Sequence, residues 1–190
     1  MVADDERTWP AMTIIDIPRH GAAALLDDDV AAAFDVVEWR RSSRPAGDSS
    51  PNSSEVRMMV EVLRRFGGLA PRALVGGRFT ANPGGRTVLE IGIGHEFEVG
   101  AVVATYPSRL WSRGFALGMP PDFVGGVSRG IEAASDLPAG VLTIDRGGFD
   151  EVNSSEVIFE QAASVLVACL AARLAGQDPE AAARRIVDSW

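Results

Sequence analysis

The sequence predicts a mixed fold in which β-rich runs alternate with helical patterns and the most apolar helix lies near the C-terminus. Runs rich in β-branched residues predict strands at 73–80, 87–93 and 140–148. Polar residues that lead into a long apolar stretch predict a helix over 153–176. The near-continuous apolar character after Val157 predicts that this helix is central and covered on most sides.

The first 70 residues are expected to complete the same sheet as the rest of the chain, and an N-terminal appendage is the alternative. A strand is predicted at 12–18, and the acidic residues 27–29 suit a helix start. The β-branched run that follows, 36–41, is expected to supply the first strand of the main sheet. Residues 42–54 are rich in Ser, Pro, Gly and Asn and predict a flexible loop.

The remaining elements follow from spacing and turn residues. A helix is predicted at 56–66, because apolar side chains recur there at helical spacing before Gly67: Val56, Met59, Val60, Leu63 and Phe66. The turn residues NPGG (82–85) predict a hairpin between the strands at 73–80 and 87–93. A third strand is expected within 97–106. Two further helices are predicted. One covers 120–135, with Phe123, Val127 and Ile131 on one stripe, and the other follows the N-cap Asp178, with Pro179 in its first position.

Composition limits the functional classes. The 190 residues carry a net charge of −8, and all 18 basic residues are arginine, so the overall field opposes direct nucleic-acid binding. The acidic start lacks the apolar segment of a signal peptide, and the apolar run 162–172 is expected to be too short to span a bilayer. A single cysteine, Cys169, excludes an internal disulfide and is expected to be a buried structural thiol. We therefore expect a cytoplasmic protein without a membrane partner.

The junction at 147–166, GGFDEVNSSEVIFEQAASVL, combines polar residues with the start of the central helix. Asn153 or Ser154 can accept backbone N–H bonds there, and Glu156 lies three residues after Asn153, which is the spacing of a capping box. The local pattern is thus typical of a stabilised helix N-terminus, and a ligand site at the same place is the alternative.

Two segments resemble domain IV of translation elongation factor G. GGFDEVNSSEVIFEQAAS resembles a family segment that typically reads GSYHDVDSSELAFKIAAS, and MPPDFVGGVSRGIEAA (119–134) resembles IPKEYIPAVEKGIKEA. The two occur in the family's order, and the resemblance covers about residues 118–171. It implies an α+β two-layer sandwich, a four-stranded mixed sheet with helices on one face and a left-handed βαβ crossover, over residues 71–190.

The resemblance also implies a binding role carried by loops at one end of the domain. Its candidate binding residues, by position, are Pro121, Asp122, Phe149, Asp150, Asn153 and Ser154. Asp150 stands where the family has a histidine, and Pro121 where it has a lysine. No P-loop precedes the domain, so GTP hydrolysis is not expected. The expectation is a non-catalytic binding module, translation- or ribosome-associated, with a protein or ribosomal partner.

Two motifs suggest an enzyme but fit poorly. GVSRG (126–130) matches the nucleophile-elbow pattern, but it lies inside a predicted helix and both histidines, His20 and His95, precede it. VLEIGIGHE (88–96) resembles the first motif of class I methyltransferases, with Glu96 in place of the third glycine. The favoured interpretation of this motif is a strand that ends in a glycine turn, and an enzyme that binds S-adenosylmethionine or a nucleotide is the alternative.

No cofactor or metal is expected. The histidines and the cysteine are far apart in sequence, and the adjacent acids Asp150 and Glu151 are typical of a turn that faces water. Arg40, Arg41 and Arg44 form a basic cluster beside the flexible loop, interpreted as solvated charge with an anionic partner as the alternative. A third hypothesis is a structural protein that forms homo-oligomers through its C-terminal helices.

Overall fold

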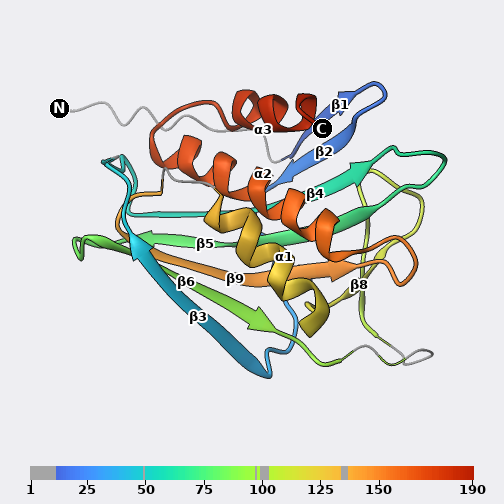
Figure 1. Cartoon of the computed structure of the whole chain (residues 1–190), viewed down its shortest axis with the longest axis horizontal. Coiled ribbons are helices and arrows are strands. Elements are labelled where there is room, and N and C mark those ends of the chain that lie inside the picture. The colour runs from blue at the N-terminus through green and yellow to red at the C-terminus, as the bar shows by residue number, and fades with distance from the viewer. Residues whose placement is uncertain (1–11, 49, 97, 99–102, 134–136) are drawn as a thin grey trace.

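The computed structural model describes residues 12–48, 50–96, 98, 103–133 and 137–190. It is an α+β protein with one curled, mainly antiparallel sheet and three α-helices on one of its faces (Figure 1). Within the described residues the sheet contains nine strands: β1 Met12–Ile17, β2 Gly21–Leu26, β3 Glu38–Pro45, β4 Glu55–Arg64, β5 Arg72–Ala81, β6 Arg86–Ile93, β7 Thr105–Tyr106, β8 Phe115–Leu117 and β9 Gly140–Phe149. The helices are α1 Pro121–Glu132, α2 Glu156–Leu174 and α3 Pro179–Asp188, with a short 3-10 helix, η1, at Val30–Ala32.

The strands are ordered β1-β2-β4-β5-β9-β6-β3, so segments from both ends of the sequence interleave in one sheet. Neighbouring strands on this path are antiparallel except β6 and β9, which run parallel. The short β7–β8 hairpin joins the end of β9 through β8. The predicted four-stranded sheet is therefore too small, because the described part of residues 71–190 supplies five strands (β5–β9) and the first 70 residues supply four more (β1–β4).

The predicted helix at 56–66 is wrong, because this segment forms strand β4. The six consecutive residues from Met58 to Leu63 are all buried, so the strand is covered on both faces and its apolar pattern does not alternate. A run that is apolar except for Glu61 contains helical spacing by chance, and neither its length nor the flanking residues distinguish a buried strand from a helix.

The predicted β5–β6 hairpin is also wrong. Both strands form, at Arg72–Ala81 and Arg86–Ile93, and the chain turns through residues 82–85. Strand β9 lies between them, however, and pairs with both. The helix start expected at 27–29 yields only the three-residue η1, and β3 covers the beginning of the predicted loop at 42–54. The third strand expected within 97–106 falls largely outside the described residues; there, β7 covers Thr105–Tyr106.

Helix α2 is the central helix, as predicted. It packs on β4 and β5 and against both other helices, and most of its apolar side chains are buried. By length and composition alone it is apolar enough to cross a membrane, but 61% of that apolar window is buried inside the protein, as expected of a core helix. Its N-cap is Ser155, whose hydroxyl accepts the Ile158 N–H (3.4 Å), so the capping box expected from Asn153 and Glu156 does not form.

Glycines in α1 allow it to lie directly against α2. A methyl group on Gly126 or Gly130 would overlap the main-chain oxygen of Glu156 or Glu160, respectively. The GVSRG sequence is therefore part of a helix–helix contact, which confirms the prediction that it lies within a helix. Exposed ion pairs from Arg129 to Glu156 and Glu160 (both 2.9 Å) border the same contact.

A smaller apolar cluster lies on the opposite face of the sheet, where the 27–36 and 103–117 segments cover part of it. Its buried members are Ala24, Leu26, Ala32, Met59, Leu74, Tyr106 and Phe115. Within this layer the buried carboxylate of Glu61 accepts a hydrogen bond from the Ser108 hydroxyl and from the amides of Arg109 (2.7 Å) and Leu110 (3.3 Å). These bonds fix the loop between β7 and β8 to strand β4.

Candidate functional site

A buried ion pair between Arg72 and Asp150 lies at one end of the sheet. Arg72 begins strand β5 and Asp150 directly follows β9, and the pairing of Ala73 with Phe149 brings them together. The Arg72 Nη2 and Nε atoms lie 2.5 and 3.0 Å from Asp150 Oδ2. Their side chains are 0% and 2% exposed. A charge pair this deeply buried is tolerated only when its remaining hydrogen-bonding groups are also satisfied.

The guanidinium of Arg72 satisfies its other donors on the β7–β8 loop. Nη1 donates to the carbonyl of Arg113 (2.6 Å) and Nη2 to that of Gly114 (2.9 Å). The guanidinium carbon also lies 4.5 Å from the centre of the Phe115 ring, a cation–π distance. One arginine thus joins the start of β5 to the loop that leads into β8.

The second oxygen of Asp150 organises the loop between β9 and α2. Oδ1 accepts from the amides of Val152 (2.9 Å) and Asn153 (3.0 Å) and from Asn153 Nδ2 (3.2 Å). Burial would raise the pKa of the Asp150 carboxyl, but hydrogen bonds from Arg72 and from these two amides outweigh it and hold that pKa below its usual value. Asp150 is therefore an ionised internal anchor, and the expectation that it faces water beside Glu151 is wrong.

Ser154 and Asn153 also direct their hydrogen bonds inward. The Ser154 hydroxyl accepts the Asp150 N–H (2.8 Å) and donates to the Arg72 carbonyl (2.7 Å). The Arg72 N–H donates to the Asn153 carbonyl (3.0 Å). Sequence reasoning selected Asp150, Asn153 and Ser154 as binding candidates, and the structure places all three in this anchor.

The other three candidates lie along a hollow next to the anchor. Pro121 and Asp122 are exposed in the first turn of α1, and Phe149 is buried at the end of β9. They line a cavity of about 380 Å³, together with Pro120, Phe123, Asp150, Glu96 and Glu151. The structure therefore brings four of the six candidates, Pro121, Asp122, Phe149 and Asp150, to one hollow.

A larger cavity of about 830 Å³ adjoins this hollow and shares Glu96 and Phe149 with it. Its lining includes the acids Asp35 and Glu98, as well as His95 and Gly94. Carboxylates at the wall oppose the phosphate groups of a nucleotide by charge repulsion. Among the described residues, no group of three or more His, Cys, Asp and Glu side chains is placed to hold a metal ion.

The glycines of the methyltransferase-like motif have packing roles. A methyl group on Gly92 would lie 2.8 Å from Val36 Cγ2, and one on Gly94 would lie 3.2 Å from the Met119 nitrogen. The Gly94 N–H donates to the Met119 carbonyl (2.9 Å). The described residues after β6 contain no helix before α1 at Pro121, so the turn lacks the helix N-terminus that a cofactor pyrophosphate or ribose site of this type requires.

The three loops that meet at the ion pair expose large apolar side chains. They are the β4–β5 turn, the β7–β8 loop and the β9–α2 loop, and all lie at the right-hand end of the molecule in Figure 1. Large apolar side chains on these loops and on the first turn of α2 are 44–77% exposed: Phe66, Leu69, Trp111, Val152 and Val157. We call these five residues the apolar tip. Sequence reasoning missed it, although apolar residues beside glycines in RFGGLAP and LWSRG were a visible signal.

Comparison with protein-family models found no family that matches the sequence, and a search of curated proteins found no matching relative.

Proposed function

We propose that this chain is a non-catalytic binding module with an elongation factor G domain IV-like fold, and that its apolar tip contacts a partner protein in a translation-related role. Chain order supports the proposed fold. The strands β5 and β6 are followed, after the short β7–β8 hairpin, by α1, β9 and α2, and β9 pairs in parallel with β6, so α1 lies in the connection between two parallel strands as a βαβ crossover requires.

The handedness of the crossover supports it further. In Figure 1, β6 and β9 both point to the right, β9 lies above β6, and α1 crosses in front of the sheet. A chain that leaves β6, returns through α1 and enters β9 in this arrangement makes a left-handed crossover. Such connections are right-handed in about 98% of proteins, so the shared exception is a specific feature.

The apolar tip carries the proposal of a binding role. Scattered exposed apolar residues are ordinary on a protein surface, but these five lie on segments held together by one buried ion pair. The buried pair joins the β7–β8 and β9–α2 loops to the start of β5, directly after the β4–β5 turn, and so gives the tip a preorganised shape, which reduces the entropic cost of binding. The apolar side chains and the net charge of −8 favour a protein surface over nucleic-acid phosphates.

A pull-down from native cell extract tests the proposal. The wild-type chain is compared with a variant that carries Phe66→Ser, Leu69→Ser and Val152→Ser, and with a control that carries Val30→Ser and Val37→Ser, two exposed apolar residues outside the tip. Mass spectrometry should find ribosomal proteins or translation factors with the wild type and the control, and their loss with the tip variant. Equal recovery with all three chains would exclude the tip. Tip-dependent recovery of an unrelated partner would exclude the translation-related role.

Two alternatives have direct tests. Calorimetric titration with S-adenosylmethionine should release no binding heat, because the glycines of the turn pack against Val36 and Met119 and no described helix begins at this turn. Light scattering over a range of concentrations tests self-association. A dimer that persists in the wild type and dissociates in the tip variant would assign the tip to a second copy of the chain.

A further inference from the structure

The edge strand β3 is exposed along nearly its whole length. Seven of its eight residues are exposed and only Arg44 is half-buried. Among the described residues β3 pairs with β6 alone, and Figure 1 shows its outer edge at the border of the sheet, away from the three helices. Such an edge presents unpaired main-chain N–H and C=O groups to which another extended chain can bind.

The register identifies which residues offer these groups. Ala46 N–H donates to the Gly85 carbonyl (3.3 Å), one step beyond the last β3–β6 pair, Pro45 with Arg86. Hydrogen-bonded pairs alternate along an antiparallel ladder. The main-chain groups of Arg44, Ser42 and Arg40 therefore point toward β6, and those of Trp39, Arg41 and Ser43 point to the open side, where the Ser43 carbonyl already accepts from Arg86 Nη2 (3.2 Å).

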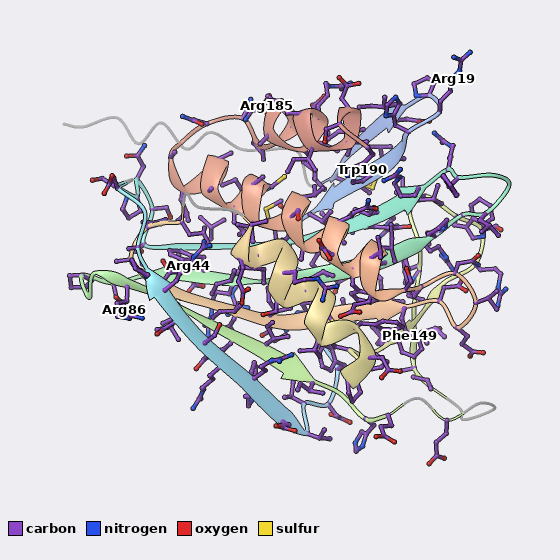
Figure 2. The ribbon with its side chains drawn as sticks, in the orientation of Figure 1. Arg19, Arg44, Arg86, Phe149, Arg185 and Trp190 are labelled. Carbon is purple, nitrogen blue, oxygen red and sulfur yellow. The ribbon has the colours of Figure 1, made fainter. Side chains whose placement is uncertain are left out.

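The strand is basic within an acidic protein. Arg40, Arg41 and Arg44 lie on β3 against a single acid, Glu38, while the whole chain carries −8. Arg41 pairs with Glu90 (2.9 Å), and Arg44 donates to the last carbonyls of α1 at Ile131 and Glu132 (3.3 and 3.1 Å). Arg40 has no ion pair among the described residues, so its charge is available to a partner. Figure 2 shows Arg44 and Arg86 near the C-terminal end of the strand.

A hollow beside the strand gives the edge room for a side chain. It has a volume of about 210 Å³ and is lined by Ser42, Ser43, Arg44, Thr87, Leu89, Ile131, Glu132 and Leu142. The Nη2 atom of Arg44 at this hollow has no hydrogen-bond acceptor among the described residues. An edge, a basic charge and an adjacent hollow are the three features that a strand-binding surface uses.

We infer that β3 binds an extended, acidic segment of another protein, which adds a strand to the sheet. A second copy of this chain is a poor occupant, because antiparallel pairing of two β3 strands would bring three arginines on each side together. The surface is separate from the apolar tip, so the two proposals can fail independently.

The test uses fluorescence anisotropy with a labelled eight-residue peptide of alternating Glu and Val. We expect saturable binding that weakens with added salt, and at least about tenfold weaker binding of a matched Lys–Val peptide and of a Glu–Val peptide methylated at alternate backbone nitrogens. Arg40→Glu should weaken binding by about tenfold as well. No saturable binding up to about 1 mM, or equal binding of the three peptides, would overturn the inference.

Ser43 provides a matched pair of variants. Ser43→Pro removes an N–H that points to the open side, whereas Ser43→Ala removes only the hydroxyl that accepts from Arg86 (2.9 Å). We expect Ser43→Pro to lose peptide binding and Ser43→Ala to keep it. A measurement on the wild type does not depend on whether either variant folds. In NMR spectra of the wild type, the added peptide should change the backbone amide chemical shifts of Trp39, Arg41 and Ser43. Shifts confined to the apolar tip, or wild-type dimers that the peptide does not dissociate, would contradict the inference.

Discussion

The Arg72 Nη2 atom lies 2.5 Å from Asp150 Oδ2, although 78 positions separate the two residues in the sequence. This pair connects the start of β5, the β7–β8 loop and the loop that enters α2. Two loops of the apolar tip, the β7–β8 loop and the β9–α2 loop, are thus joined to the start of β5 by this internal charge pair, and the Glu61 carboxylate holds the β7–β8 loop as well.

Asp150→Ala should destabilise the protein by about 3–5 kcal/mol, because it leaves the buried guanidinium of Arg72 without a counter-ion. Urea denaturation measures the change. The double variant Arg72→Leu, Asp150→Leu should lose less than the sum of the two single variants. Additive losses would show that the two side chains stabilise the fold independently. Asp16→Ala, which removes an exposed pair with Arg65, is the control and should cost less than about 1 kcal/mol.

The same pair predicts a dependence of stability on acid. Burial alone would raise the pKa of Asp150 in the folded protein, but the hydrogen bonds from Arg72 outweigh it and hold that pKa below its ordinary value of 3.8. The unfolded chain therefore binds this proton at higher pH than the folded chain does. The ionised Asp150 carboxylate therefore makes its full contribution to the free energy of unfolding at pH values above its unfolded pKa. That contribution is lost as the pH falls from the unfolded pKa through the lower folded pKa.

Urea midpoints measured between pH 7 and pH 2 should show this loss in the wild type. Asp150→Asn should be less stable at neutral pH and show a smaller decline below about pH 4, because it lacks the titrating group. Identical acid profiles for the wild type and Asp150→Asn would contradict the assignment of the pair as an internal anchor.

The sequence revealed the local elements better than their pairing. Helix α3 with its cap at Asp178, the central helix α2 and the strands β5, β6 and β9 were predicted, because each has its own periodicity or turn residues. The insertion of β9 between β5 and β6 was not, since a turn at 82–85 specifies a change of direction and not the neighbour of each strand.

The candidate site was predicted in location but not in chemistry. The polar residues before α2 were identified, yet whether they face a partner or the interior depends on Arg72. That arginine becomes the partner of Asp150 only through the register of β5 on β9, a non-local property. The apolar tip was missed for a similar reason, because its residues lie on segments far apart in sequence: Phe66, Leu69, Trp111, Val152 and Val157.

Gly126→Ala tests the contact between α1 and α2. Alanine is favoured over glycine within a helix by up to about 1 kcal/mol, but here the added methyl group would overlap the main-chain oxygen of Glu156. Backbone cannot move aside as a flexible side chain can, so we expect a net destabilisation of about 1–3 kcal/mol. Ser128→Ala, at a half-buried position of the same helix that does not face α2 through its backbone, should change stability by less than about 0.5 kcal/mol. Thermal unfolding compares the two, and a stabilised Gly126→Ala variant would refute the close contact.

Cys169 should be inert while the protein is folded. The thiol is fully buried in α2 and donates to the Pro179 carbonyl of α3 (3.4 Å), and burial raises its pKa to about 12. A cysteine thiol with the ordinary pKa of 9.0 would have about a thousandfold more thiolate at neutral pH than Cys169 has, and the thiolate is the reactive form. We expect Ellman's reagent to label the thiol at pH 8 only as fast as the protein opens, and within seconds in denaturing urea. Cys169→Ala supplies the blank. Rapid stoichiometric labelling of the native protein would mean that α2 and α3 separate readily, and that the C-terminal helices do not form a fixed part of the core.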